Sequence, residues 1–354
     1  MRTSKFSDSD MNNHILEDDV RLFAERFELW EQLRGKTFLI TGATGLIGSV
    51  MTMCLLELNR RKHLGIKILA AVRNIEKANL LFGQDKGDLQ FLQIGLKDIC
   101  AESICQHVDY VIHLASPTAG RFMEENPVET FDLAYRSTYA LLNLAKETHV
   151  KGMVYVSSLE YYGQVLDDRI ITEDLQGYVD SQSSRSSYPL GKRAAEYLCY
   201  AFSKEYGVQA KVARLTQTFG AGIFETDNRV FAQFARSIIK GEDIVLHTTG
   251  ESAKPYCYTT DCISAILYIL LIGQSGDAYN VANTDTYITI RELAEFMKLH
   301  FNPDIEVRVE LNDYMGYAPV TKLQLSTQKL SVLGWRPNYN LYQMLERLLQ
   351  FMKG

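Results

Sequence analysis

Between residues 36 and 218, two kinds of apolar pattern alternate along the chain. Short runs that are apolar almost throughout are followed by longer stretches with apolar residues at helical spacing. Such runs predict parallel strands buried on both faces, and the longer stretches predict the helices that cover them. We expect an α/β fold with a doubly wound parallel sheet. The expected strands are "KTFLIT", "KILAAVR", "LQFLQIG", "DYVIHLAS", "GMVYVSS" and "QAKVARLT".

The pattern loosens after about residue 220. Helices are expected at 229–240, 261–272 and 289–300, separated by short strands such as "DIVLHTT" and "AYNVAN". This favours a smaller C-terminal substrate-binding α/β part. The expected division is 35–220 for the cofactor domain, with later returns of the chain, and 221–354 mainly for substrate.

An extension at the N-terminus, residues 1–34, precedes the first strand. Residues 1–12 are polar and predicted to be irregular. Residues 14–34 predict one amphipathic helix with Leu16, Val20, Phe23, Phe27 and Trp30 on one stripe. This stripe either packs on the body of the protein or forms a subunit contact.

Three glycines lie between the first strand and the helix after it, in the segment "TGATGLIG". Their spacing is G-x-x-G-x-x-G, which differs from the general G-x-G-x-x-G fingerprint. Glycine permits a tight turn and lets a pyrophosphate approach the first N–H groups of the helix. A Rossmann-type cofactor domain is therefore predicted, with contacts from Gly42, Thr44, Gly45, Leu46, Ile47 and Gly48.

The end of the second strand bears on the choice of cofactor. An acidic residue there would bind the ribose 2′-OH of NAD, but Val72 occupies the place and Arg73 follows. Arg73 and Lys77 together suit a 2′-phosphate, so NADP(H) is favoured over NAD(H). The alternative is that Arg73 stacks on the adenine, which either cofactor permits.

Tyr188 and Lys192, in "SSYPLGKRAAE", lie four residues apart on one face of a predicted helix. A free phenol has a pKa of about 10 and is a poor base at neutral pH. A neighbouring ammonium and a positively charged nicotinamide would both lower that pKa. After a glycine turn and a strand ending in two serines, the pair is a candidate catalytic base with its partner.

Composition excludes some classes of function. The formal net charge is −6, which disfavours a nucleic-acid-binding surface. The six cysteines include no C-x-x-C pair, so a reduced, cytoplasmic protein without a metal site is expected. No signal peptide and no apolar run long enough to span a membrane are evident.

Taken together, the motifs resemble those of the extended short-chain dehydrogenases/reductases, in the NAD-dependent epimerase/dehydratase family that acts on nucleotide sugars. The resemblance covers roughly residues 35–350. It is carried by "TGATGLIG", "HLAS", "VSSLEYYG", "YPLGK", "ARLTQTFGAG", "DNRVFAQFARSIIKGEDIVL", "YCYTTDCISAIL" and "LGWRP". "HLASP", the Ser-x-Glu before Tyr-Gly, and "DNRV" are most similar to UDP-glucuronate decarboxylases.

The resemblance implies an enzyme that abstracts a hydride from a nucleotide-diphospho-sugar to give a keto-sugar, with a tightly bound cofactor and a homodimeric assembly. Tyr188 would be the base, Ser158 would bind the reacting oxygen, and Lys192 would hold the nicotinamide ribose. The implied catalytic residues are Ser158, Glu160, Tyr188 and Lys192. Further cofactor contacts are implied for Leu114, Ala115, Ser157, Tyr188 and Lys192, and substrate contacts for Ser116, Ser158, Glu160, Gln217, Arg229 and Lys254.

Several positions depart from the decarboxylases and put the identity of the sugar in doubt. Lys254 stands where an arginine is usual, and lysine lacks the bidentate fork that arginine offers a diphosphate. Gln217 and Ala134 stand where asparagines are usual, and Gly95 where an acidic residue is usual.

Glu160 is expected to choose the second chemical step. A 4,6-dehydratase needs an acid–base pair after the serine, and Leu159 is apolar. A decarboxylase keeps the glutamate with a small polar residue before it, whereas a 4-epimerase leaves Glu160 unexplained. An NADP-dependent reductase or dehydrogenase of a nucleotide-linked keto sugar or alditol needs only Ser158, Tyr188 and Lys192. A non-catalytic NAD(P)-binding sensor is the alternative of another class.

Overall fold

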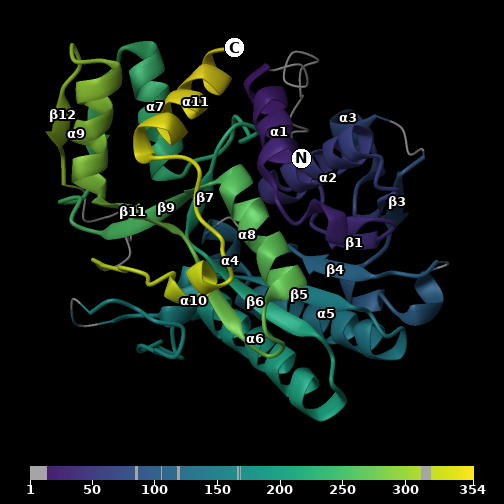
Figure 1. Cartoon of the computed structure of the whole chain (residues 1–354). Coiled ribbons are helices and arrows are strands. Elements are labelled where there is room, and N and C mark those ends of the chain that lie inside the picture. Colours follow the sequence, from purple (N-terminus) through teal and green to yellow (C-terminus); the bar gives the residue numbers. More distant parts are fainter. Residues whose placement is uncertain are drawn as a thin grey trace.

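A seven-stranded parallel sheet forms the centre of the computed structural model, which describes residues 14–83, 87–104, 106–117, 120–165, 167, 169–311 and 320–354 (Figure 1). Our prediction for residues 1–12 lies outside these ranges. The strand order is β10-β6-β5-β4-β1-β2-β3, and every pairing is parallel. The strands are β1 (Thr37–Thr41), β2 (Lys67–Val72), β3 (Leu89–Gln93), β4 (Tyr110–His113), β5 (Gly152–Ser158), β6 (Ala210–Leu215) and β10 (Ala278–Val281).

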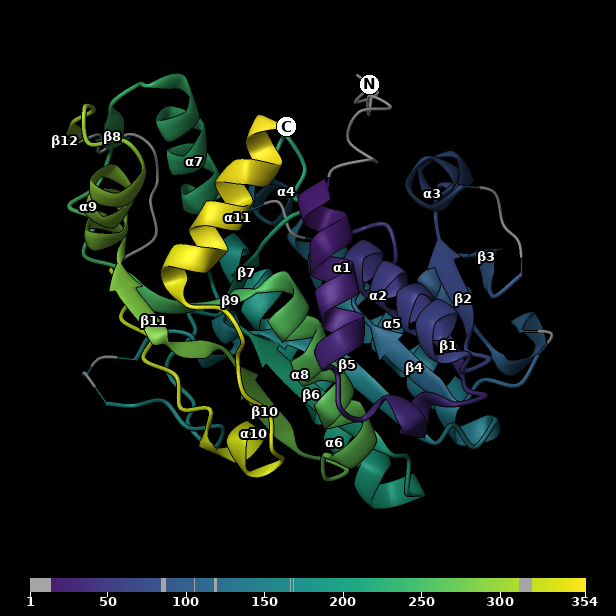
Figure 2. The ribbon, with the colours of Figure 1, turned by 45° about the horizontal axis from the view of Figure 1, so that its top comes forward.

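Helices cover both faces of this sheet (Figures 1 and 2). Successive residues of a strand point to opposite faces, so Phe38 and Ile40 pack into one core and Leu39 into the other. The first core includes α2 (Leu46–Lys62) and α8 (Thr259–Ile272), and the second includes α5 (Pro127–Glu147) and α6 (Ser187–Tyr206). The predicted doubly wound α/β fold is confirmed.

The strand order reverses between β1 and β4. In open parallel sheets, ligands bind beyond the carboxyl ends of the strands at such a reversal. The segments that follow β1, β4 and β5 therefore meet at one edge of the sheet, and these segments contain most of the residues expected to bind cofactor.

The C-terminal part builds a second, smaller layer beside that edge. It contains a three-stranded sheet in the order β11-β9-β7 and a two-stranded sheet of β8 and β12. Three helices pack with these strands in a separate core. The elements are β7 (Gln217–Phe219), α7 (Val230–Lys240), β8 (Ile244–Leu246), β9 (Ala253–Tyr258), β11 (Asn283–Thr289), α9 (Ile290–Phe301), β12 (Val307–Val309) and α11 (Leu341–Lys353).

Two elements after residue 220 return to the large sheet. Strand β10, from the segment "AYNVAN", pairs with β6, and α8 packs on β5 and β6. These two returns lie in the middle of the C-terminal part. The remaining elements are α3 (Ile75–Phe82), α4 (Gly120–Glu125), α10 (Gln328–Val332) and the 3₁₀ turns η2 (Trp30–Leu33), η3 (Leu96–Asp98), η4 (Ala101–Ser103), η5 (Leu159–Tyr162) and η6 (Ser184–Ser186).

The N-terminal helix is shorter than predicted. Helix α1 (His14–Arg26) ends before Phe27, and the chain continues into the 3₁₀ turn η2, so the prediction of one helix over 14–34 is wrong. Its apolar stripe packs within the chain, where the Phe27 and Tyr268 rings meet edge to face with centroids 6.0 Å apart. Buried Asp19 accepts hydrogen bonds from Tyr258 of β9 and Arg347 of α11. Packing on the body, the first of the two interpretations, is the one observed.

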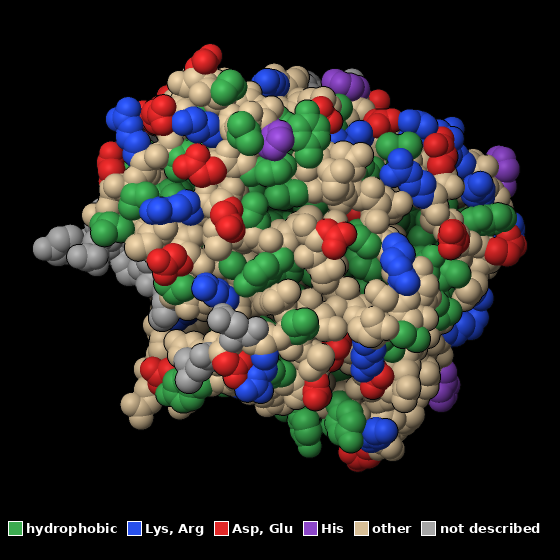
Figure 3. Space-filling model, turned by 60° about the vertical axis from the view of Figure 1, so that its left-hand side comes forward, with side chains coloured by type: hydrophobic (Ala, Val, Ile, Leu, Met, Phe, Trp, Pro, Cys, Tyr) green, Lys and Arg blue, Asp and Glu red, His purple; other side chains and the backbone are tan. Residues whose placement is uncertain are grey.

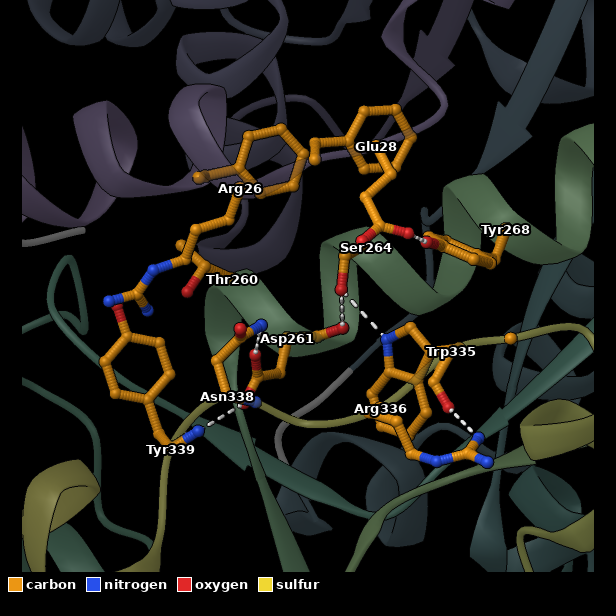
Figure 4. Close-up of a pocket in the computed structure, with 13 residues that line it drawn as sticks. Arg26, Glu28, Thr260, Asp261, Ser264, Tyr268, Trp335, Arg336, Asn338 and Tyr339 are labelled. Atoms are coloured by element: carbon orange, nitrogen blue, oxygen red, sulfur yellow. Dashed lines mark hydrogen bonds between the residues drawn. The ribbon is translucent and has the colours of Figure 1, made fainter.

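A pocket of about 200 Å³ lies between α1, α8 and the "LGWRP" segment (Figure 4). The Trp335 indole donates to Ser264 at 2.9 Å, and Asp261 accepts hydrogen bonds from Asn338. Glu28 accepts from the Tyr268 hydroxyl. These contacts anchor the "LGWRP" segment and the N-terminal extension to α8.

The surface on the side of α9 carries basic and acidic side chains interspersed with apolar ones (Figure 3). No single sign of charge dominates this face. Among the described residues, no helix is both long enough and apolar enough to cross a membrane.

Candidate active site

The glycine turn after β1 leaves room for a ligand at the start of α2. Gly42 has a φ of +70°, and a Cβ there would lie 2.8 Å from the Ala115 nitrogen. A Cβ at Gly48 would collide with the Gly42 carbonyl. Gly45 caps α2 without any side-chain hydrogen bond, so the N–H groups of Leu46 and Ile47 have no side-chain cap. This uncapped helix start suits a pyrophosphate and supports the predicted dinucleotide site.

His113, at the end of β4, ties the glycine turn to the neighbouring strand. Its Nδ1 lies 2.7 Å from the Thr41 hydroxyl and its Nε2 lies 3.1 Å from the Ser137 hydroxyl. Ser137 donates to the Leu133 carbonyl, so Ser137 accepts from Nε2–H and Nδ1 accepts from Thr41. Thr41 in turn accepts from the Ala115 N–H. Burial lowers the pKa of His113 to about 3, so this imidazole is neutral.

Tyr188 and Lys192 lie in the first turns of α6, facing the end of β5. The Ser158 and Ser116 hydroxyls lie near the Tyr188 hydroxyl and lower its pKa. The Lys192 ammonium donates to the Val156 carbonyl at 2.9 Å and lies 5.4 Å from the centre of the Tyr188 ring. The structure thus brings together three of the four expected catalytic side chains, with Ser116 beside them.

The pKa of Tyr188 is set by its surroundings. Burial raises the pKa of Tyr188, and the charge of Glu160 raises it further, whereas Ser158 and Ser116 lower it. Burial also lowers the pKa of Lys192, to about 8. The sequence analysis expects the ammonium and a positively charged nicotinamide to lower the Tyr188 pKa together. In the chain without the nicotinamide, desolvation is the larger effect, and the combined expectation stays a prediction.

Glu160 faces this group from the 3₁₀ turn η5. Its charge raises the pKa of Tyr188, Lys192 and Lys254, so the carboxylate lies near all three side chains. Leu159, the residue before it, points elsewhere. Leu159 is buried in a cluster with Ile171 and residues 323 and 325.

The substrate side carries a group of cations. Lys254 lies on β9. Burial and the charges of Arg229 and Arg185 lower the pKa of Lys254, whereas the charge of Glu160 raises it. Arg229 caps α7 and pairs with Asp227 at 2.6 Å. Gln217, on β7, pairs in register with Tyr256, two residues after Lys254. Arg185 was missed by sequence reasoning, although it lies only three residues before Tyr188.

The basic pair after β2 lies at the adenosine end of the expected cofactor site, with Lys77 half-buried. Arg73 is exposed, and its charge helps burial to lower the pKa of Lys77. The Lys77 ammonium lies 4.5 Å from the centre of the Phe224 ring, in the segment after β7. At the next strand, the Asp98 carboxylate occupies the space that a side chain at Gly95 would take.

A buried ion pair under the site was also missed. Arg214 of β6 pairs with Glu196 of α6 at 2.8 Å, and both side chains are almost fully buried. Ser157 is buried on the α6 side of β5, and its hydroxyl lowers the pKa of Glu196. A cofactor contact of Ser157 therefore stays a prediction. In the described part of the chain, no three His, Cys, Asp or Glu side chains are grouped to hold a metal.

Comparison with known sequences gives one family and a set of relatives. Residues 38–282 match the NAD dependent epimerase/dehydratase family. The chain is 28% identical over 307 residues to UDP-glucuronic acid decarboxylase 6 of Arabidopsis thaliana, covering 87% of this chain and 86% of that protein. The family match spans the glycine turn, Tyr188 and Lys192.

Comparison with solved structures supports the fold. UDP-glucose 4-epimerase of Thermotoga maritima superposes with a TM-score of 0.75 at 20% identity, over 90% of this chain and 98% of that one. A dTDP-glucose 4,6-dehydratase from Bacillus anthracis superposes with a TM-score of 0.73 at 20% identity, over 90% and 96%. Proteins with similar folds thus include an epimerase and a dehydratase, so the fold alone does not identify the reaction.

Proposed function

Because this chain belongs to the NAD dependent epimerase/dehydratase family, we propose that it oxidises a nucleotide-diphospho-sugar to a keto-sugar and then returns the hydride. The bound nicotinamide supplies the chemistry of accepting the hydride and giving it back. The chain's own residues supply proton transfer, orientation and charge. Tyr188 takes the proton of the reacting hydroxyl, and Ser158 and Ser116 hold the phenol in place.

The electrostatics of Tyr188 bear directly on this first step. Protein groups alone leave the phenol protonated, since burial and Glu160 raise its pKa. The phenolate therefore forms only when a positive charge is bound next to it. This couples proton abstraction to the oxidised, positively charged form of the cofactor, because the reduced form lacks that charge.

For the second step we propose decarboxylation of a nucleotide-linked hexuronic acid. Oxidation at C4 makes the C6 carboxylate a β-keto acid. The C5–C6 bond then breaks, CO₂ leaves, and the electron pair remains as an enolate that takes a proton at C5. The observation that carries this choice is the position of Glu160. It is a single acid–base group whose charge raises the pKa of both Tyr188 and Lys254. The similarity to a UDP-glucuronic acid decarboxylase supports it.

The burial of Leu159 argues against dehydration. A 4,6-dehydratase needs a second acid beside the glutamate to expel hydroxide. Position 159 is apolar and packs into a core cluster, so it offers no proton donor. The same packing removes the objection that Leu159 raised against decarboxylation, because this side chain does not face the sugar.

The nucleotide diphosphate is proposed to bind between Lys254, Arg229 and Arg185. The charges of Arg229 and Arg185 help to lower the pKa of Lys254, and the charge of Glu160 opposes them there. Arg229 already pairs with Asp227 and donates to the Thr218 carbonyl. Arg185 lies 3.5 Å from Glu124, so among the three cations Lys254 provides the charge that a diphosphate has yet to neutralise.

The test is a panel of nucleotide sugars, with and without a C6 carboxylate, analysed by mass spectrometry and by the absorbance of reduced nicotinamide. Decarboxylation predicts loss of the mass of CO₂ from the uronic acid alone, with no net change in cofactor. An isomer of unchanged mass would indicate epimerisation. Stoichiometric consumption of added NADPH would indicate the reductase, and no hydride exchange with any substrate would indicate a sensor.

We also propose a homodimer formed through α5 and α6. Phe131, Tyr135 and Tyr139 stack along the exposed face of α5, and Tyr200 of α6 is about half exposed. Leu141 and Leu142 are fully buried in the core and cannot contribute. Tyr139→Glu should shift sedimentation toward the monomer.

The five cysteines that the structure describes are free, which supports a cytoplasmic location.

A further inference from the structure

Arg193, the residue after Lys192, binds the backbone of the turn that carries Glu160. Its Nε donates to the Tyr161 carbonyl at 2.8 Å, and its Nη2 donates to the Gly177 carbonyl at 2.8 Å and the Tyr162 carbonyl at 3.3 Å. Tyr161 and Tyr162 are the last two residues of η5. One partly buried guanidinium therefore joins the end of this turn to the segment that returns at Gly177.

Carbonyl groups at the end of a helical turn have no partner within the turn. In η5 these carbonyls lie among buried residues, since Tyr161 and Tyr162 are both buried. At the other end, the Ser158 hydroxyl accepts from the Glu160 N–H at 3.2 Å. Glu160 is thus held between a cap formed by Ser158 and a clamp formed by Arg193.

The side chain of Glu160 makes no hydrogen bond or ion pair with any described residue. Its position toward Tyr188 and Lys254 is therefore set by the backbone of η5. We propose that Arg193 is a positioning residue, which fixes Glu160 for the step that follows oxidation. The proposal rests on the proposed function and adds a residue to it.

The rest of η5 has anchors that do not depend on Arg193. The Tyr161 hydroxyl accepts from Gln176 at 2.9 Å, and the Tyr162 hydroxyl donates to Asn280 at 2.6 Å. The Tyr161 ring also packs 3.5 Å from the Arg214 guanidinium carbon. Loss of Arg193 should therefore release the backbone of the turn while leaving its aromatic side chains in the core.

The experiment compares Arg193→Gln and Arg193→Lys with Arg169→Gln as matched control. Arg169 lies in the same returning segment but is exposed, and among the described residues it pairs only with Asp167. Two rates are measured with the nucleotide sugar that the wild type converts: hydride uptake by the bound cofactor and release of product. Arg193→Gln should slow product release by about 10- to 100-fold, with a much smaller effect on hydride uptake. The reduced cofactor should then accumulate.

Glu160→Gln provides the second half of the test. If Arg193 acts through Glu160, adding Arg193→Gln to Glu160→Gln should cause little further loss. Arg193→Lys should restore part of the activity, because an ammonium can reach one of the three carbonyls. Equal losses in both steps, or additive losses in the double variant, would overturn the proposal.

A readout without substrate separates this proposal from the proposed function. Hydrogen exchange should accelerate in Arg193→Gln at the Gly163 and Gly177 amides, which donate to the Glu160 and Tyr162 carbonyls. It should be unchanged in Arg169→Gln. If the wild type converts no nucleotide sugar, the proposed function fails while this exchange still tests the clamp. Unchanged exchange in Arg193→Gln would overturn the clamp itself.

Discussion

Lys192 and Lys254 are both lysines within reach of Glu160, but their surroundings differ. The Lys192 ammonium donates to the Val156 carbonyl, and the nearby His113 is bonded through both ring nitrogens. On the proposed substrate side, the Lys254 ammonium has no hydrogen bond or ion pair with any residue in the described ranges. The charges of Arg229 and Arg185 help to lower its pKa. Burial lowers the pKa of both lysines.

The difference shows which polar groups the fold satisfies and which it leaves for a ligand. A buried charge without a partner is unfavourable, so a protein keeps one where binding supplies the partner. On the cofactor side, the polar groups of Lys192 and His113 find their partners within the chain, while the N–H groups at the start of α2 stay uncapped. On the proposed substrate side, the charge of Lys254 is left for a ligand, and this is where Lys254 and Gln217 depart from the decarboxylase pattern.

Removing the Tyr188 hydroxyl tests the group that lies between the two sides and should have the largest effect. Tyr188→Phe should lower turnover by about 10²- to 10⁴-fold, because the proton acceptor is lost while the ring remains. Binding of NAD and of the nucleotide sugar, measured by calorimetry, should change little. Tyr178→Phe is the control, since Tyr178 is 63% exposed. Near-normal turnover in Tyr188→Phe would remove Tyr188 from the mechanism.

Replacing Lys254 tests whether its charge is kept for a ligand. Lys254→Met should raise KM for the nucleotide sugar by about 10- to 100-fold, as one charge-assisted contact to a diphosphate is lost. Binding of NAD should not change. The melting temperature should stay the same or rise, because a half-buried charge without a protein partner is removed. Lys254→Arg should preserve binding. A fall in melting temperature with unchanged KM would show that Lys254 is structural.

The sequence predicts the cofactor side better than the substrate side for a physical reason. Strands, the glycine turn and the Tyr188–Lys192 spacing are local patterns, so periodicity and short motifs report them. Arg185 and Arg193 act on groups brought near by tertiary folding, and no local pattern marks such partners. The same holds for β10, since "AYNVAN" predicts a strand without telling which sheet it joins. The high pKa of Tyr188 depends on burial, which a motif does not encode.

The acid stability of the cofactor side should depend on His113. Its folded pKa of about 3 lies below the unfolded value, so below pH of about 6.5 the folded state binds fewer protons than the unfolded state does. Stability from this group is complete above pH of about 6.5 and declines below it, by up to about 1.4 kcal/mol per pH unit. Asp19 and Asp261, with pKa values raised to about 6, act in the opposite direction.

The His113 contribution is isolated by comparing the wild type with His113→Gln in denaturant titrations at several pH values. The two aspartates are present in both proteins, so their contributions to the free energy of unfolding cancel in the difference. The wild type should be the more stable protein at neutral pH, and its advantage should shrink as the pH falls below 6.5. His300→Gln is the control, because His300 is exposed. A difference that does not change with pH would mean that His113 does not become charged on unfolding.

Arg73 should have the smallest effect, because it is exposed and its charge is screened by salt. If it binds a 2′-phosphate, Arg73→Gln should weaken NADP binding by about fivefold or less and leave NAD binding unchanged. Lys67→Gln is the control, since Lys67 is exposed at the opposite end of β2. Equal weakening of both cofactors, insensitive to salt, would favour stacking of Arg73 on the adenine. Then only the sugar side of this protein would use unpaired charge to select its ligand, and the contrast between the two sides would be sharper.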